Sequence, residues 1–302
     1  MKKHGFFQSK EDSCLFLRIR GTEKIFLVIY VGDGITDSNQ QSLIDEFQIR
    51  FHPVERFEGI NINRDRQKKK IHLSQPYYTT EVIKKFRMTT CFPKKIPADP
   101  DTRLEKKEPV EAVGSLLYLA LVTRPDMAFA VGQVSHFVES PNSSHVNAVH
   151  HIISYLKRTS SHGICFDGYA PPSYPIGYSD ADWGGCLDSQ RSTTGTIFIL
   201  YGGPIAWSSH RQKCMSTSTV EAEYIAASEA TQEAVWIRRI LQDFRLGNGE
   251  PIIIKSENHG AIQLTCHPAQ RQRTKHIDIT YHFVRSKQED RDIDIQVVNS
   301  QH

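Results

Sequence analysis

Apolar positions in the first third of this chain alternate between strand-like runs and helical spacing. The continuous β-branched run over residues 25–31 ends at Gly32-Asp33-Gly34, which predicts a buried strand that enters a tight turn. Residues 39–51 carry apolar side chains at three- and four-residue spacing, so a helix is predicted there, and a short strand is predicted over 57–62. These segments indicate part of a sheet, not a whole one.

Helical spacing dominates the middle of the chain. A short helix is predicted over residues 75–86, and the proline-rich passage 93–109 then reads as a linker. Three helices are predicted next, over 110–122, 126–138 and 143–156. Thr123, two residues before Pro125, is the expected N-cap of the second, and Ser143 or Ser144 that of the third. This region is predicted to be a small bundle or a helical connector.

After Pro171-Pro172 the pattern changes to strands. Residues 176–183, 194–200 and 204–208 predict a three-stranded meander with glycine-rich turns at 184–185 and 202–203. A helix over 218–244 follows, then a strand at 252–255, helices near 260–264 and 278–287, and a last strand at 293–298. The expected fold class is therefore α/β, or α+β taken over the whole chain.

Length and composition narrow the class of protein. A chain of 302 residues can form two domains, or one domain with a helical appendage. It holds no run of 18 apolar residues and no apolar signal core at its start, so neither a membrane span nor secretion is expected. The six cysteines form no C-x-x-C pair, which argues against a zinc ribbon or a disulfide framework. We expect an intracellular protein, cytoplasmic or nuclear.

The net charge of +3 is too small to attract nucleic acid through a global field. Local basic runs remain as candidates for phosphate contact, although solvated loops explain such runs equally well. The candidates are Arg66, Lys68, Lys69 and Lys70 in one run, and Arg271, Arg273 and Lys275 in the other. The histidines His145, His150 and His151 have no acidic or cysteine partner at ligand spacing, so a helical surface is favoured over a metal site.

Three acidic residues occur in an order that suits a metal site. Asp180 leaves the first strand of the meander, Glu223 lies on the helix that follows, and Glu257 ends the fourth strand. Any one of them alone is more simply a solvated carboxylate, so the inference depends on the ordered set. Magnesium takes oxygen ligands, and two such ions about 4 Å apart can activate water and stabilise the leaving oxygen of a phosphodiester. No P-loop, dinucleotide fingerprint or G-x-S-x-G motif competes.

Four motifs carry a family resemblance, namely Tyr-Ser-Asp-Ala-Asp-Trp at 178–183, Ser-Gln-Arg-Ser-Thr-Thr-Gly at 189–195, the segment 216–224, and Lys-His-Ile-Asp at 275–278. They resemble the ribonuclease H region of Ty1/copia-type retrotransposon Pol polyproteins. Upstream, residues 113–119, 123–126 and 155–159 resemble the connection segment of that family. Residues from 73 are similar to its reverse transcriptase thumb, and Tyr30-Val31-Gly32-Asp33 falls where the family has its palm turn, Tyr-Val-Asp-Asp. The resemblance covers nearly the whole chain.

The resemblance implies three regions: a partial reverse transcriptase palm and thumb over 1–92, a linker and helical connection over 93–172, and a ribonuclease-H-like domain over 173–302. It implies that Asp180, Glu223 and Glu257 hold Mg²⁺, with Mn²⁺ as the alternative. Glu223 is chosen over Glu221 because it directly precedes the helical Tyr-Ile-Ala stretch. Asp278 is a weaker fourth candidate. The implied partner is an RNA–DNA hybrid or another nucleic acid, and other Pol segments are further candidates.

Departures from the family pattern lower the expected activity. Gly32 replaces the first Asp of the polymerase turn, so DNA synthesis is not expected. Glu257 stands where the family has Asp, and its extra methylene displaces the carboxylate by roughly 1 Å, where such an error can cost about a hundredfold in rate. The resemblance also implies a final helix, with a fourth acidic ligand, beyond residue 302. We expect weakened cleavage of RNA in hybrids. The alternatives are a catalytically silent nucleic-acid-binding or interaction remnant, and a chain with no stable function.

Overall fold

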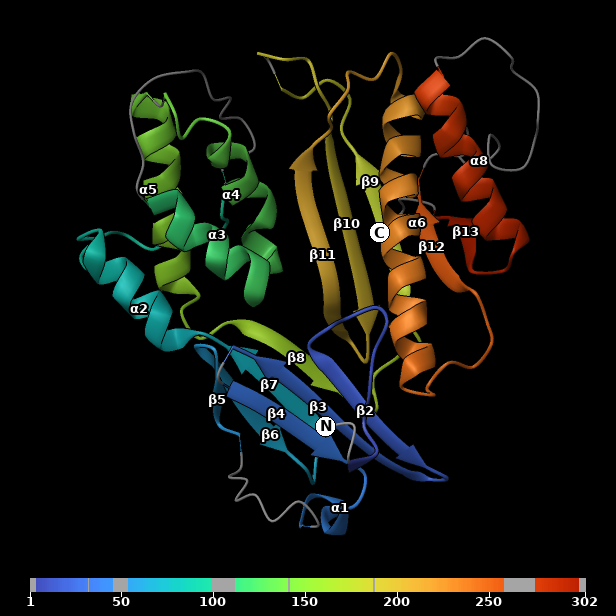
Figure 1. Ribbon diagram of the computed structural model, residues 1–302. Helices are drawn as coiled ribbons and strands as arrows, with labels where there is room; N and C mark the ends of the chain where they lie inside the picture. Colours follow the sequence, from blue (N-terminus) through green and yellow to red (C-terminus); the bar gives the residue numbers. More distant parts are fainter. Residues whose placement is uncertain are drawn as a thin grey trace.

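The computed structural model describes residues 4–31, 33–45, 54–98, 112–140, 142–186, 188–257 and 275–298. Its strands form three sheets, in the orders β1-β2-β3-β4, β5-β6-β7-β8 and β11-β10-β9-β12-β13. A group of helices lies beside the five-stranded sheet, and the two four-stranded sheets lie below both in Figure 1. The mixed α/β architecture expected from the sequence is confirmed.

The first sheet is an antiparallel meander of β1 (Phe7–Gln8), β2 (Leu15–Arg20), β3 (Glu23–Tyr30) and β4 (Asp33–Ser38), followed by the short helix α1 (Gln41–Asp45). The predicted strand and turn are confirmed, because Tyr30 pairs with Asp33 across a tight hairpin. The predicted burial of this strand is wrong, since Ile25 is buried but Val28 and Tyr30 are exposed. β1 and β2 were not predicted. Leu15 and Leu17 are buried two residues apart on β2, but charged residues interrupt this short alternation.

The second sheet is also antiparallel and joins distant parts of the chain. It contains β5 (Arg56–Phe57), β6 (Ile60–Asp65), β7 (Lys70–Ser74) and β8 (Gly163–Asp167). The strand predicted over 57–62 is confirmed only in part, because a turn divides it between β5 and β6: Glu58 and Gly59 both have positive φ, at 47° and 78°. β7 and β8 pair across the boundary predicted at residue 92, so that boundary does not separate two sheets.

Five helical segments share one apolar core. They are α2 (Pro76–Lys85), α3 (Ala112–Val122), the 3₁₀ turn η2 (Pro125–Met127), α4 (Ala128–Ser135) and α5 (Ser143–Arg158). Leu116, Met127, Val131, Ile152 and Leu156 are all fully buried in this core. The predicted helices of this region are confirmed, and the core shows why: their apolar positions meet one another at helical spacing.

Two predicted caps in the helical region are wrong. The Asn142 side chain accepts from the His145 backbone N–H at 3.1 Å, and the Asn142 backbone N–H donates to His145 Nδ1 at 2.8 Å, so Asn142 caps α5 in place of Ser143 or Ser144. This also corrects the surface placement of His145, which is fully buried. Thr123 caps nothing; its hydroxyl donates to Gln75 Oε1 at 2.8 Å.

The Thr-Arg-Pro-Asp motif at 123–126 has a structural use. Arg124 is 2% exposed, and its guanidinium donates to Asp126 Oδ2 at 2.7 Å and to the Thr159 carbonyl at 3.1 Å. Tyr155 also donates to Asp126, at 2.7 Å. These bonds hold the pKa of Asp126 below its usual range against the opposing effect of burial, which is the largest single influence. The motif ties η2 to the end of α5.

The carboxyl-terminal sheet combines a meander with two parallel strands. β9 (Ile176–Ala181), β10 (Thr193–Leu200) and β11 (Gly203–Arg211) are antiparallel, whereas β12 (Ile252–Ser256) runs parallel to both β9 and β13 (Ile293–Val297). The long helix α6 (Thr219–Asp243) lies along one face of this sheet, beside α8 (Lys275–Glu289) (Figure 1). All the predicted strands and both long helices are confirmed, while the helix predicted at 260–264 lies outside the described residues.

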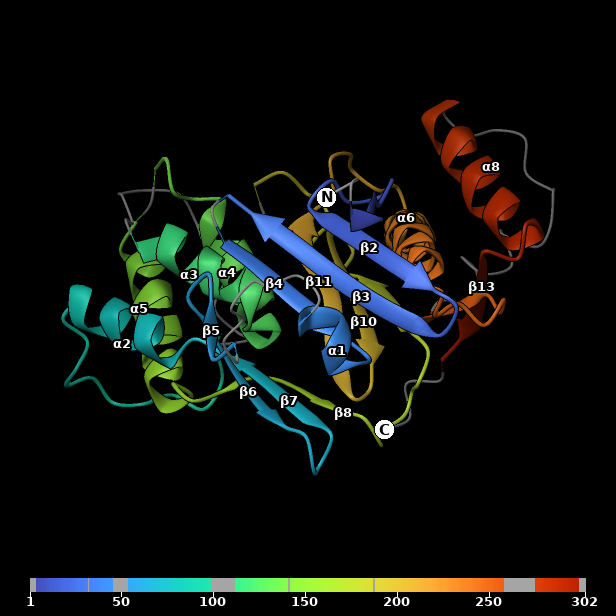
Figure 2. The same cartoon turned by 60° about the horizontal axis from the view of Figure 1, so that its bottom comes forward.

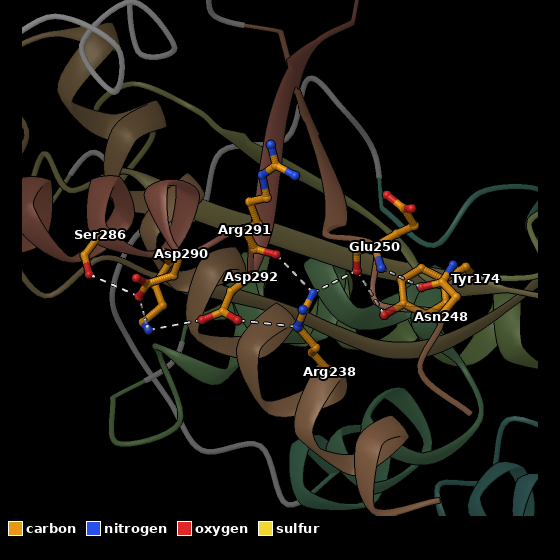
Figure 3. A network of polar contacts seen from close by, with 9 residues as sticks. Tyr174, Arg238, Asn248, Glu250, Ser286, Asp290, Arg291 and Asp292 are labelled. Atoms are coloured by element: carbon orange, nitrogen blue, oxygen red, sulfur yellow. Dashed lines mark hydrogen bonds and ion pairs between the residues drawn. The ribbon is translucent and has the colours of Figure 1, made fainter. Parts of the chain in front are cut away.

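Arg238 on α6 contacts the segments that precede β12 and β13. Its guanidinium reaches from α6 to the backbone carbonyls of Glu250 at 2.8 Å and Arg291 at 3.1 Å, and it pairs with Asp292 at 3.4 Å. Figure 3 shows these contacts of Arg238. Asp292 also forms an ion pair with Lys287, at 3.1 Å. The turn between α8 and β13 is therefore held to α6 by charge and by backbone hydrogen bonds.

The first sheet packs against the carboxyl-terminal end of α6. The Lys24 ammonium donates to the carbonyls of Phe244 and Arg245, both at 3.1 Å, where a helix leaves such groups unpaired. The Phe26 ring meets Phe244 edge-on, with centroids 4.6 Å apart. Figure 2 shows β2 and β3 extended across this side of the molecule. Residues near the start of the chain thus pack directly against residues more than 200 positions later.

Candidate active site

Strand register brings two of the predicted acidic residues together. β9 and β12 are parallel neighbours, and Ser179 pairs with Ser256. Asp180 and Glu257 each follow by one position, so they lie side by side at the same edge of the sheet. Both side chains are exposed. This register explains why the two residues, expected to converge, lie at the same edge.

Helix α6 supplies the third acidic residue. Ser218 caps the helix by accepting from the Glu221 backbone N–H at 3.2 Å. Glu221 itself turns back to accept from the backbone N–H of Thr217 at 2.7 Å, so its carboxylate is engaged in the helix start. Glu223 lies on the buried side of the same turn and is 8% exposed. The two glutamates thus lie in different environments, and the choice of Glu223 over Glu221 as a ligand stays a prediction.

Glu223 has an unusual electrostatic environment. Its Oε2 atom is buried and has no hydrogen-bond partner in the structure. Burial, and after it the nearby carboxylates of Asp180 and Glu257, raise the pKa of the Glu223 carboxyl to about 7, while a hydrogen bond from the Ala181 backbone N–H opposes the rise. A buried acid beside two others is a common property of functional sites.

The donor set suits a hard cation but is not complete by itself. In the described part of the chain, no group of three or more His, Cys, Asp or Glu side chains is arranged to hold a metal ion. Magnesium, however, is usually held by one or two carboxylates together with waters and substrate phosphates. The unpartnered Glu223 Oε2 beside Asp180 fits that pattern. Asp182 has a structural contact of its own, because its Oδ1 accepts from the Thr193 N–H at 2.6 Å.

Several predicted site residues cannot be compared with the structure. Arg271 and Arg273 lie outside the described residues. The backbones of Lys275 and Asp278 belong to α8, but their side chains are not described. Their roles therefore stay predictions.

The basic run at 66–70 is not brought to the acidic edge. It occupies the hairpin between β6 and β7, whose sheet lies at the opposite end of the molecule from the edge where β9 ends (Figure 1). Lys68 and Lys70 pair with Asp65 at 3.6 Å and Asp167 at 3.0 Å, and the Lys69 ammonium lies 4.7 Å from the Tyr169 ring centroid. Arg66 is exposed. Nearby carboxylates thus offset part of the charge of this run.

The predicted degenerate polymerase motif forms the hairpin turn between β3 and β4. Tyr30 is 52% exposed and Val31 is 95% exposed, with the positive φ of 52° that such a turn requires. Asp33 begins β4 and is exposed, while Gly32 lies outside the described residues. The motif stands apart from Asp180 and Glu223.

A cavity beside the acidic edge contains residues that the sequence interpretation missed. Its volume is about 430 Å³, and it lies between the sheet and the segment from Pro125 to Phe129. Its walls include Asp180 and Glu257 together with Tyr178, Trp207 and Lys255. The alternation within each strand was a usable signal, since Tyr178 is two residues before Asp180 and Lys255 is two before Glu257.

Three antiparallel strands, a helix and two further parallel strands define a ribonuclease-H-like domain, with its acidic site at the edge where β9 and β12 end. Residues 1–100 match the family model described as "Reverse transcriptase (RNA-dependent DNA polymerase)". The chain is 35% identical to the retrovirus-related Pol polyprotein from transposon TNT 1-94 of Nicotiana tabacum, over 99% of this chain and 24% of that protein.

A second relative is the retrovirus-related Pol polyprotein from transposon RE1 of Arabidopsis thaliana, 34% identical over 94% of this chain and 20% of that protein. Over most of its length the chain is thus similar to retrovirus-related Pol polyproteins of transposons, at 34–35% identity. It spans about a quarter or less of the length of these two relatives, 24% and 20%.

Among solved structures, the foamy viral protease-reverse transcriptase in complex with dsDNA matches with a TM-score of 0.49 and 16% identity, over 91% of this chain and 55% of that one. A score and an identity this low do not establish a shared activity. None of the helices in the described ranges combines the length and the hydropathy needed to cross a membrane.

Proposed function

We propose that the acidic edge is the active site of a metal-dependent ribonuclease that cleaves the RNA strand of RNA–DNA hybrids. The observation that carries the proposal is Glu223, a buried carboxyl with an unpartnered oxygen beside Asp180 and Glu257. The similarity to Pol polyproteins supports it, because the motifs in the carboxyl-terminal part of the chain resemble the ribonuclease H region of such polyproteins. Neither the metal nor the substrate is given by the fold alone.

In this proposal Asp180 and Glu223 hold Mg²⁺, and Glu257 supports the ion directly or through water. The ion would supply a Lewis acid and a water of lowered pKa at the scissile phosphate. The protein's own contribution is charge and position. The raised pKa of Glu223 keeps part of its population protonated near neutrality, and a bound cation favours the ionised form that can act as a ligand. The extra methylene of Glu257 is the reason to expect weakened activity.

The decisive experiment is hybrid cleavage. Purified chain with Mg²⁺ or Mn²⁺ and a labelled RNA–DNA hybrid should release short RNA products. Asp180→Asn and Glu223→Gln should each lower the cleavage rate by at least about a hundredfold, since each replaces a negatively charged carboxylate ligand of the metal with a neutral amide. Asp182→Asn is the matched control, because Asp182 bonds a backbone N–H instead, and it should keep most of the activity. Equal rates in Asp180→Asn and the unchanged chain would refute the proposal.

A second candidate function has its own observation. The described residues contain no group of three acidic or histidine side chains arranged for a metal, as a silent nucleic-acid-binding remnant would show. Binding of the hybrid without cleavage at any Mg²⁺ or Mn²⁺ concentration would favour this reading. Under both readings we propose no DNA synthesis, because Gly32 removes a carboxylate of the polymerase turn. The intracellular location stays a prediction.

A further inference from the structure

One row of side chains crosses four strands next to the acidic edge. Trp207 pairs with Ile197, Ile197 pairs with Tyr178, and Tyr178 pairs with Lys255. Residues in register on neighbouring strands have side chains on the same face, so these four line one face of the sheet. All four also line the cavity of about 430 Å³. We call them the aromatic row.

The face that carries the aromatic row is the one opposite α6. Phe198, the neighbour of Ile197 along β10, is fully buried in the core that α6 covers. Strand alternation therefore directs Ile197 and its row away from α6. Tyr178 is 38% exposed, and Phe129, which lines the same cavity from α4, is 53% exposed. The row thus offers aromatic surface to solvent.

The row ends in a positive charge and adjoins the acidic site. The Lys255 ammonium lies 5.5 Å from the centroid of the Tyr178 ring. Asp180 and Glu257 stand two residues further along the same two strands, a distance of roughly 7 Å. Beside Asp180 on the neighbouring strand lies Gly195, where an added Cβ would meet only the Asp180 carbonyl, at 3.9 Å. The sheet surface next to Asp180 therefore carries no side chain on that side.

We propose that the aromatic row binds an unpaired nucleotide of the substrate strand, with its base on Tyr178 and its phosphate at Lys255. This inference rests on the proposed function and names a substrate preference for it: hybrids with a single-stranded extension beside the cleavage point. Aromatic side chains next to a positive charge bind single strands because every base has a face that can stack. A duplex keeps its bases stacked inside, so it gains nothing from such a surface.

Anchoring of Trp207 supports a platform of fixed shape. Its indole N–H donates to the Ala120 carbonyl at the end of α3, at 2.7 Å. Gly132 of α4 allows close approach to the same strand, since an added Cβ would lie 3.2 Å from the Ser209 carbonyl. The helical region therefore holds β11 and one wall of the cavity together, so the surface needs little reorganisation to bind.

The test measures affinity in the full-length chain carrying Asp180→Asn, with Mg²⁺, so that binding is observed without cleavage. The probes are a fluorescent blunt RNA–DNA hybrid and the same hybrid with a short unpaired RNA extension. The extension should tighten binding about tenfold, and Tyr178→Thr should remove that gain, while Tyr178→Phe should keep it. Lys255→Gln should weaken binding of the extended probe, reduce the salt dependence of that binding by about one phosphate contact, and leave the affinity for the blunt hybrid nearly unchanged.

Matched controls lie on α2. Tyr77 is 61% exposed with an arginine, Arg56, 5.2 Å from its ring, and Lys84 is an exposed lysine paired with Glu81. Tyr77→Thr and Lys84→Gln should leave both affinities unchanged. Thermal melts of each variant are the check that Tyr178→Thr is folded. If Tyr178→Thr does not fold, Tyr178→Phe and Lys255→Gln still test the proposal. Equal affinity for the two probes, or equal effects of Tyr178→Thr and Tyr77→Thr, overturns the proposal.

The outcome is separable from that of the proposed function. Cleavage of hybrids by the unchanged chain, with no preference for the extended probe, would retain the nuclease and reject the platform. Binding of the extension through Tyr178 without any cleavage would retain the platform and reject the nuclease.

Discussion

Glu223 is the residue of this site whose ionisation is expected to affect the stability of the fold most. Its carboxyl is almost fully buried, and its pKa is raised to about 7 chiefly by that burial, from an ordinary value of 4.5. A raised acid pKa means that the folded state binds a proton more tightly than the unfolded state. The contribution of this proton to stability is complete at low pH and is lost as the pH rises through about 7.

The corresponding prediction concerns metal-free protein. Between about pH 5 and pH 8 the free energy of unfolding should fall by about 2–3 kcal/mol because of Glu223 alone. Burial lowers the pKa values of His136 and His145, so the contribution of these histidines to the free energy of unfolding changes with pH in the opposite direction. The test is therefore the difference between the unchanged chain and Glu223→Gln, measured by denaturant unfolding at each pH. A difference that does not vary with pH would show that Glu223 titrates normally.

The same residue marks how far the sequence predicted the site. Asp180 and Glu257 converge because of β9–β12 register, which the strand order already indicated. The burial of Glu223 and its free oxygen were not predictable, because they depend on how α6 lies against the sheet. Tyr178 and Lys255 belong to the same register, two residues before the acidic pair, and the alternation along each strand could have placed them beside it.

At the scale of elements, prediction succeeded where one face of an element is buried and failed where local chemistry decides. The apolar spacing of α3 to α6 was sufficient, since each packs one face into a core. The strand over 57–62 was confirmed only in part because Glu58 adopts a left-handed conformation that its residue type does not suggest. The α5 cap failed because His145 serves as the capping partner in place of the usual Glu or Gln.

Two adjacent arginines of α6 give a prediction for the carboxyl-terminal domain. The Arg238 side chain is 14% exposed and bonds two carbonyls and Asp292, so Arg238→Ala should lower the free energy of unfolding by about 2–3 kcal/mol. The Arg239 side chain is 54% exposed and pairs with Glu11 at 3.5 Å, so Arg239→Ala should cost less than about 1 kcal/mol. Equal losses in urea unfolding would contradict the role assigned to the Arg238 contacts.

At the scale of the whole molecule, the contact between the first sheet and α6 joins the amino-terminal and carboxyl-terminal parts of the chain. Phe26 and Lys24 bind the end of this helix, although they belong to the segment that matches the reverse transcriptase model. The predicted division at residue 92 stays a prediction, but the sheets and cores do not follow it.

Loosening that contact should have a local effect. Phe26→Ala should raise amide hydrogen exchange in β2 and β3 by roughly tenfold or more and leave β9 and β10 nearly unchanged, because it removes an aromatic contact worth about 1–2 kcal/mol. Phe7→Ala is the control, since Phe7 is 44% exposed at the sheet edge. A uniform rise in exchange over the whole chain would show instead that the two parts unfold together.

The pairing of β7 with β8 has a consequence for synthesis on the ribosome. The two strands are separated by roughly 90 residues, from 74 to 163. While the chain grows, β7 has no neighbour on that side until all of the intervening helices have emerged, so its open edge can recruit other nascent chains. Chaperone occupancy should therefore last until β8 has left the exit tunnel, long after the β6–β7 hairpin itself has been made.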